Sequence, residues 1–135
     1  MKNIPLITIL TFFAIGFYMC GQEGERSSAA KSSIEFDTLS HSYGEILFNS
    51  DGEYEFVFTN TGKAPLIVSH VKSTCGCTIP EWSKEPLNAG QKGRIKVSYD
   101  THRVGAFAKS IYVYSNAENG VIKLMISGKV KPLDS

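Results

Sequence analysis

Three segments of the chain alternate between apolar and polar residues. Large apolar side chains occupy every second position in residues 53–59, 94–99 and 122–127, and most of the positions between them are polar. Such alternation buries one face of a β-strand and leaves the other face in water. No comparable segment shows the period of an amphipathic helix. The pattern therefore predicts strands rather than helices.

Shorter or more mixed apolar runs complete this picture. They cover residues 34–37, 43–48, 65–71 and 107–114, and Asn, Asp and Gly are concentrated in turns at residues 49–52, 60–62, 88–90 and 116–120. About seven short strands with turns at this spacing predict an all-β fold, a single antiparallel immunoglobulin-like β-sandwich. The residues expected to form its core are Phe56, Phe58, Ile95, Val97, Ile111, Val113, Leu124 and Ile126.

The N-terminus indicates export from the cytoplasm. Lys2 precedes an apolar run over residues 4–19, which is shorter than the about 20 residues of a membrane-spanning helix and typical of a signal peptide. The run ends at Cys20, which resembles the lipidated cysteine of a bacterial lipoprotein, although Phe17 and Met19 depart from the usual Leu and small residue. An uncleaved anchor and ordinary secretion are the alternatives.

This interpretation divides the chain into four parts. Residues 1–19 form a lipoprotein-type signal peptide, residues 20–33 a flexible tether without large apolar side chains, residues 34–131 the sandwich and residues 132–135 a tail. Removal of residues 1–19 takes away one of 14 basic residues and leaves 13, against 13 acidic ones. A neutral chain is not typical of proteins that bind nucleic acid or an anionic membrane surface. Its expected membrane contact is the lipid anchor alone.

An ordered series of motifs resembles the bacterial domain-of-unknown-function 1573 family over residues 36–130. The motifs, in chain order, are FVFTNTG at 56–62, PLI at 65–67, CGCT at 75–78, AGQKG at 89–93, VSYD at 97–100, GAF at 105–107 and SN at 115–116. Asn88-Ala89-Gly90 stands where the family usually has Pro-Gly. The resemblance implies an exported protein, often a lipoprotein, with a sandwich similar to major-sperm-protein and hydin-like domains. It implies no activity.

Cys75 and Cys77 are the first candidate site. Both lie in one turn, so they cannot form the disulfide that joins the two sheets of antibody domains. Extended backbone would place their Cα atoms about 6.6 Å apart, within reach of a local disulfide that Gly76 would help to close. Such a bridge closes almost no loop and adds little stability. A structural turn, packing as small apolar side chains and pairing with another protein are further interpretations.

Metal binding and thiol redox chemistry are the functional alternatives for this turn. Two thiolates with the imidazole of His70 would suit Cu(I) or Zn(II), although the spacing matches no common zinc motif. His70 alone is more often an ordinary strand residue. His102 would need the fold to bring it near, and His41 carries no signal. A redox dithiol needs a lowered thiol pKa, and only Lys72 is close in sequence.

Aromatic residues form the other candidate site. Trp82, in a Pro-bounded loop after the cysteines, presents a recognition surface or covers the open end of the sandwich. Tyr112 and Tyr114 alternate with buried positions, so they mark a partner-binding face or pack across neighbouring strands.

These observations favour a protein that is not an enzyme. The sequence has no nucleophile elbow, no zinc-protease motif, no phosphate-binding glycine loop and no evident pair of catalytic carboxylates. We expect no cofactor, apart from the Cu or Zn alternative. The expected function is that of an exported, lipid-anchored interaction or structural module of the cell envelope, with an envelope protein as partner.

Overall fold

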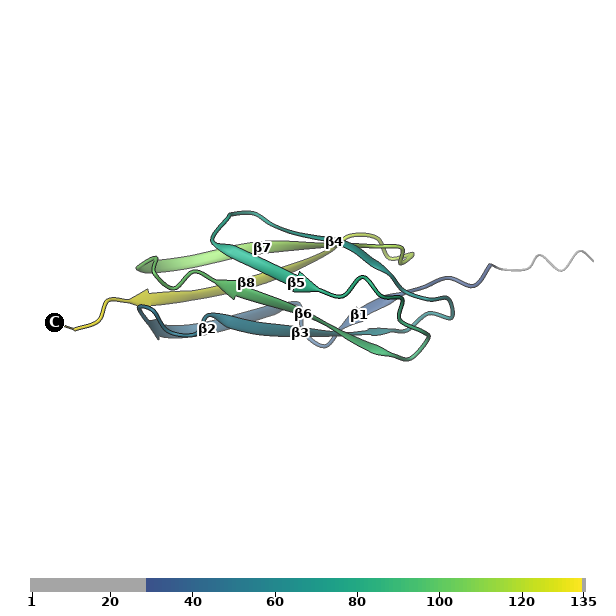
Figure 1. Cartoon of the computed structure of the whole chain (residues 1–135), viewed down its shortest axis with the longest axis horizontal. Coiled ribbons are helices and arrows are strands. Elements are labelled where there is room, and N and C mark those ends of the chain that lie inside the picture. The colour runs from purple at the N-terminus through teal and green to yellow at the C-terminus, as the bar shows by residue number, and fades with distance from the viewer. Residues whose placement is uncertain (1–28, 135) are drawn as a thin grey trace, which may run out of the picture.

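Residues 29–134 are described by this computed structural model and form a sandwich of two four-stranded sheets (Figure 1). The strands are β1 (Ile34–Phe36), β2 (Ser40–Leu47), β3 (Glu53–Asn60), β4 (Val68–Ser73), β5 (Thr78–Trp82), β6 (Lys92–Tyr99), β7 (Gly105–Ser115) and β8 (Ile122–Lys131). The predicted all-β, immunoglobulin-like sandwich is confirmed, with eight strands rather than seven. The predicted signal peptide and Cys20 lie outside the described residues.

The additional strand is β5. The interpretation of this segment as a Pro-bounded loop was wrong, because Thr78–Trp82 pairs along its length with β6. Proline has no N–H group and is normally excluded from the middle of a sheet. Here Pro80 is tolerated because β5 is an edge strand, with β6 as its only neighbour in the sheet.

Sheet I contains the strands in the order β1-β3-β6-β5, and every neighbouring pair is antiparallel. Its outer face carries acidic side chains on β3 and basic side chains on β6. Arg94 lies 3.2 Å from the Glu55 carboxylate, and Lys96 lies 3.0 Å from that of Glu53. Acidic and basic side chains are therefore mixed on the outer face of sheet I, and two ion pairs join them.

Sheet II contains the strands in the order β2-β8-β7-β4. The predicted antiparallel pairing holds for β7 with β8 and for β4 with β7, but β2 runs parallel to β8. The reason is that β1 and β2, which follow each other closely in sequence, belong to different sheets. The chain crosses from the edge of sheet I to the edge of sheet II and there joins its C-terminal strand.

The core lies between the two sheets. All eight predicted core residues are buried, with at most 3% of each exposed. Burying one such side chain contributes about 1.5–3 kcal/mol, so this layer is the main source of stability. Further residues in the same cluster are Ile34, Leu66, Val68, Val71, Cys77, Tyr99, Phe107, Ala117 and Val130.

A buried amide fixes one end of the sandwich. Asn60 is fully buried, and its Nδ2 donates to the carbonyl oxygens of Ala64 at 2.8 Å and Leu87 at 3.0 Å. Its Oδ1 accepts from the N–H groups of Gly62 at 3.0 Å and Ser33 at 3.5 Å. One side chain thus connects the loops after β3 and before β6 to the segment that leads into β1.

The end of the predicted tether is part of this structure. Ser32 is buried, and its hydroxyl lies 3.1 Å from the Asn116 carbonyl oxygen. The Lys63 N–H donates to the carbonyl of Lys31 at 2.9 Å. The chain enters the sandwich at this end and leaves it, after β8, at the opposite end of the long axis (Figure 1).

Candidate functional site

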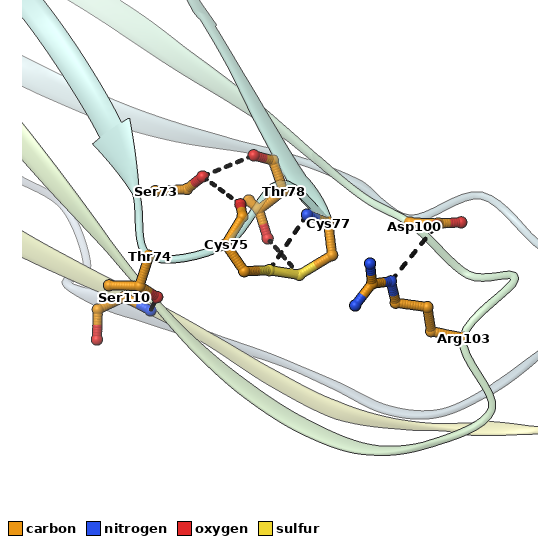
Figure 2. Close-up of a disulfide and its surroundings, with 8 residues drawn as sticks. All are labelled: Ser73, Thr74, Cys75, Cys77, Thr78, Asp100, Arg103 and Ser110. Carbon is orange, nitrogen blue, oxygen red and sulfur yellow. Dashed lines mark hydrogen bonds and ion pairs between the residues drawn. A yellow bond between two sulfur atoms is a disulfide. The ribbon is translucent and has the colours of Figure 1, made fainter.

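The Cys-Gly-Cys turn connects β4 of sheet II to β5 of sheet I (Figure 2). The Ser73 hydroxyl lies 2.7 Å from the Cys75 carbonyl oxygen and 2.8 Å from that of Thr78. The Thr74 N–H donates to the Ser110 carbonyl on β7 at 3.0 Å. Hydrogen bonds within the turn and to β7 therefore hold it in place before any covalent link is considered.

Cys75 and Cys77 form a disulfide within this turn, with their Cα atoms 5.3 Å apart (Figure 2). Cys77 is 2% exposed and belongs to the core, whereas Cys75 is partly buried and packs against it. The Asp100 N–H donates to the Cys77 carbonyl at 2.8 Å, which joins the turn to the loop after β6. The bridge is local and does not connect distant strands.

Glycine is not required to close this bridge. Gly76 does not adopt a left-handed backbone, and a Cβ atom placed there would meet no heavy atom within 4 Å. The turn therefore reaches a Cα separation of 5.3 Å, within the ordinary range for disulfides, without a backbone conformation that favours glycine.

His70 lies among aromatic rings. Its ring centroid is 6.0 Å from that of Trp82, in an edge-on arrangement, and 5.9 Å from that of Tyr114. Within residues 29–134, no group of three or more His, Cys, Asp and Glu side chains is arranged to hold a metal ion. The structure thus does not assemble His70 with the two cysteines into such a group.

Trp82 is the last residue of β5 and is half-buried against the core. Its indole Nε1 donates to the Val68 carbonyl oxygen on β4 at 3.2 Å, and the Lys84 Nζ lies 5.9 Å from its ring centroid. Trp82 therefore links the edges of the two sheets and leaves part of its ring at the surface.

Tyr112 and Tyr114 lie on the outer face of sheet II. The neighbours of Tyr112 across the sheet are Lys72 on β4 and Lys123 on β8, and Tyr114 pairs with His70. We call Tyr112, Tyr114, Lys72 and Lys123 the aromatic–lysine face. A shallow hollow of about 350 Å³ opens on this face, lined by Lys72, Ser73, Thr74, Tyr112 and Tyr114. Tyr112 and Tyr114 thus lie together on the outer face of sheet II, beside cations that the alternation pattern alone did not place there.

A second aromatic cluster was missed from the sequence. His41, which carried no signal, stacks on Tyr54 with ring centroids 3.6 Å apart, and burial lowers its pKa. Tyr43 donates its hydroxyl to the Gly52 carbonyl at 2.8 Å. Burial, together with the nearby negative charge of Asp51, raises the pKa of Tyr43 to about 12. These residues come from strands of different sheets, so no local pattern could have identified the cluster.

The loop after β6 holds His102 on the side of Asp100. The His102 Nδ1 lies 3.0 Å from the Asp100 carboxylate, and the His102 N–H donates to the same oxygen at 3.1 Å. These bonds to His102 hold the pKa of Asp100 below its usual value. His102 is therefore engaged within its own loop.

In the described part of the chain, no helix is long and apolar enough to span a membrane.

Solved structures resemble this sandwich at low sequence identity. A protein of unknown function from Porphyromonas gingivalis W83 aligns with a TM-score of 0.65 and 12% identity, over 73% of this chain and 46% of its own. The ASH/PapD-like domain 7 of human CEP192 has a TM-score of 0.65 and 11% identity, over 77% of this chain and 89% of its own. The secreted serine protease VesC of Vibrio cholerae aligns with a TM-score of 0.54 and 11% identity, over 73% of this chain and 23% of its own. These matches show the fold alone.

This chain spans less than half of the Porphyromonas protein and about a quarter of the Vibrio protease. A search of curated proteins finds no match to the sequence.

The sequence model of one family does match, over residues 34–130, which is the entire sandwich apart from the last residue of β8. The chain therefore belongs to the family described as protein of unknown function (DUF1573).

Proposed function

We propose that this protein is an exported, lipid-anchored interaction module of the bacterial cell envelope, and that it binds a protein partner through the aromatic–lysine face. The observation that carries the proposal is the arrangement of Tyr112 and Tyr114 beside a hollow on the outer face of sheet II. Tyrosine is enriched at protein interfaces because a rigid ring and a hydroxyl contact a partner together.

The disulfide supports export. Bridges between cysteines persist in oxidising compartments outside the cytoplasm and are rare inside it. The apolar segment at residues 4–19 and the cysteine at position 20 support a lipid anchor at the N-terminus. An anchor there would leave the long faces of the sandwich accessible, because the chain enters the domain at one end of its long axis (Figure 1).

Mass spectrometry of the native protein tests export and anchoring together. We expect a mature chain that begins at Cys20, carries lipid on that residue and has an oxidised Cys75–Cys77 pair. A chain that retains residues 1–19, or that begins at another residue without lipid, would contradict the lipid anchor. A fully reduced pair in freshly isolated protein would argue against export.

Crosslinking in intact cells tests the interaction face. We expect a recurrent envelope protein to be captured by the wild type and by the Cys75→Ser/Cys77→Ser variant, and to be lost with Tyr112→Ala/Tyr114→Ala. Ile79→Ala is the matched control, since Ile79 is 63% exposed on sheet I, away from this face. Capture that is unchanged by loss of the two tyrosines would refute the proposal, as would a set of proteins that varies between repeats.

Thiol–disulfide exchange is a second candidate, favoured by the bridge itself. Cys75 is only partly buried, so an external thiolate would reach its sulfur more easily than that of Cys77. If the bridge is exchanged in the cell, alkylation of trapped thiols should reveal a reduced fraction that changes with the redox state of the medium. A pair that stays oxidised in the native protein under mild reductant would exclude this role.

A further inference from the structure

The charges of this nearly neutral chain are not evenly distributed between the two outer faces. On sheet II, the charged residues at outward positions of the strands are Lys72, Lys123, Lys129, Lys131 and Glu45. The only acidic member, Glu45, forms an ion pair with Lys131 at 2.5 Å. Lys129 lies directly across from Glu45 in the sheet, whereas Lys72 and Lys123 form no ion pair within residues 29–134. The outer face of sheet II therefore has an excess of uncompensated positive charge.

Sheet I shows that this is not a general property of the surface. Its outward positions carry Glu35, Glu53, Glu55, Glu81, Lys92, Arg94 and Lys96. Acidic and basic residues alternate across neighbouring strands there, and two ion pairs form. A solvated sheet face with no binding role is expected to look like sheet I, because like charges on neighbouring strands destabilise a sheet and opposite charges stabilise it.

The uncompensated cations flank an aromatic ring. Lys72, Tyr112 and Lys123 occupy one row across three neighbouring strands. Since strands lie about 4.8 Å apart, the two lysine Cα atoms are about 10 Å from each other, with the tyrosine between them. His70 and Tyr114 form the next row on β4 and β7. A ligand that lies on this face would meet a ring at its centre and an ammonium group on either side.

The shape of the face distinguishes between anionic ligands. Tyr112 and Lys72 line a hollow, and Tyr112 itself is partly buried. A membrane surface touches the parts of a protein that protrude, whereas a polypeptide can place side chains into a hollow and its backbone across the tyrosine rings. Carboxylates on alternate residues of an extended chain lie about 6.8 Å apart, so flexible lysine side chains can reach them from both sides.

From this arrangement we infer that the aromatic–lysine face binds an extended acidic segment of a polypeptide. The inference rests on the proposed function, since it names the chemistry of the partner that the interaction module receives. Complementary charge would raise the rate of association and select against basic partners, while the tyrosines supply the contact area. Lys129, further along β8, faces Glu45, so the uncompensated positive charge is concentrated at Lys72 and Lys123.

Fluorescence anisotropy with a labelled peptide of alternating glutamate and serine tests this inference on the full-length protein. We expect binding at low salt that weakens as salt is added, since surface charges are screened within about 10 Å at 0.1 M. The peptide with glutamine in place of glutamate should not bind. In Lys72→Gln/Lys123→Gln the affinity should fall about tenfold, since two exposed charge contacts are removed.

The matched control is Lys63→Gln/Lys92→Gln. It removes the same charge from residues outside sheet II, and neither lysine forms an ion pair within the described part of the chain. We expect its affinity for the peptide to equal that of the wild type. An equal loss in both double variants would mean that only net charge matters, and would overturn the inference.

Two further probes identify other anionic ligands. One probe is a vesicle that contains an anionic phospholipid, and the other is polygalacturonate. The inference is overturned if either probe binds in a manner that depends on Lys72 and Lys123 while the acidic peptide does not bind. Failure of the proposed function is a separate result. A captured partner that requires the two tyrosines but neither the two lysines nor low salt supports the interaction module and refutes the acidic partner. Lysine-dependent binding of the peptide without any captured partner would support the acidic ligand and refute the envelope interaction module.

Discussion

At the scale of single residues, Asn60 determines how one end of the sandwich closes. It is fully buried, yet its amide makes hydrogen bonds to groups of Ala64, Leu87, Gly62 and Ser33. A buried polar group is tolerated only when its hydrogen bonds are satisfied. The sequence identified this residue as part of a turn, but not as the buried centre of that turn, because its partners are spread over more than fifty residues of chain.

Replacement of Asn60 by Ala should therefore destabilise the protein strongly. The change removes the buried amide and takes a hydrogen-bond partner from half-buried groups of Ala64 and Gly62, which costs about 2–4 kcal/mol. Urea denaturation measures the loss. Asn88→Ala is a suitable control, since Asn88 is exposed in the loop before β6, and it should change the free energy of unfolding by less than about 0.5 kcal/mol. Equal effects of the two changes would show that the amide of Asn60 is not structural.

Tyr43 predicts a loss of stability in alkali. Its pKa is about 12 in the folded protein against 10.0 normally, so between these values the folded state keeps a proton that the unfolded state has lost. The stabilising contribution is therefore complete below pH 10 and disappears as the pH rises to about 12. Tyr43→Phe loses the bond to Gly52 but has no phenol to ionise at this position. The gap in urea midpoint between the wild type and Tyr43→Phe should narrow from pH 9 to pH 11; a constant gap would contradict the assignment.

At the scale of elements, most strands were predictable because alternation is a local property. The buried faces of β3, β6 and β8 follow directly from residues two positions apart. β5 was missed because Pro80 normally argues against a strand, and only the position of β5 at the sheet edge makes it acceptable. The parallel pairing of β2 with β8 joins segments from the two ends of the domain, so no short window of sequence contains it.

The same distinction applies to the candidate site. The alternation around Ile111 and Val113 correctly placed Tyr112 and Tyr114 on a second face. It did not place Lys72 and Lys123 beside Tyr112, because that neighbourhood depends on the register between three strands. The sequence therefore predicted an aromatic surface, and the sheet register reveals that it is also cationic.

Gly93 on β6 tests how closely this strand and the Phe58 ring of β3 are packed. Gly93 lies directly across from Phe58, and a Cβ atom there would collide with the Phe58 ring and approach the Leu87 Cδ1 to 2.7 Å. Gly93→Ala should lower the free energy of unfolding by about 1–3 kcal/mol, since the added methyl group would displace the ring of Phe58, which is only 3% exposed, from its place in the core. Gly76→Ala adds the same methyl group where no atom lies within 4 Å, so it should be nearly neutral. If both variants unfold at the same urea concentration, the packing argument is wrong.

At the scale of the whole molecule, the two sheets depend on one shared core. Inward-facing side chains of both sheets, such as Ile95 and Leu124, belong to a single buried cluster. The disulfide closes only the turn between Cys75 and Cys77 and joins no distant segments. Chain entropy accordingly limits its contribution to about 1–2 kcal/mol, compared with about 3–5 kcal/mol for bridges that close long loops. The free energy of folding is therefore supplied by burial of the core, and the sandwich should survive reduction.

Urea unfolding of the reduced and oxidised protein, followed by two probes, tests this conclusion. The chain contains one tryptophan, so fluorescence reports the surroundings of Trp82 at the edge of sheet I, while far-UV circular dichroism reports both sheets. We expect the two transitions to coincide, because a shared core cannot lose one sheet and keep the other. After reduction the midpoint should fall by the amount that corresponds to about 1–2 kcal/mol, and the two probes should still agree. Separate transitions would mean that the sheets unfold independently, and unfolding upon reduction alone would mean that the bridge, rather than the core, holds the sandwich together.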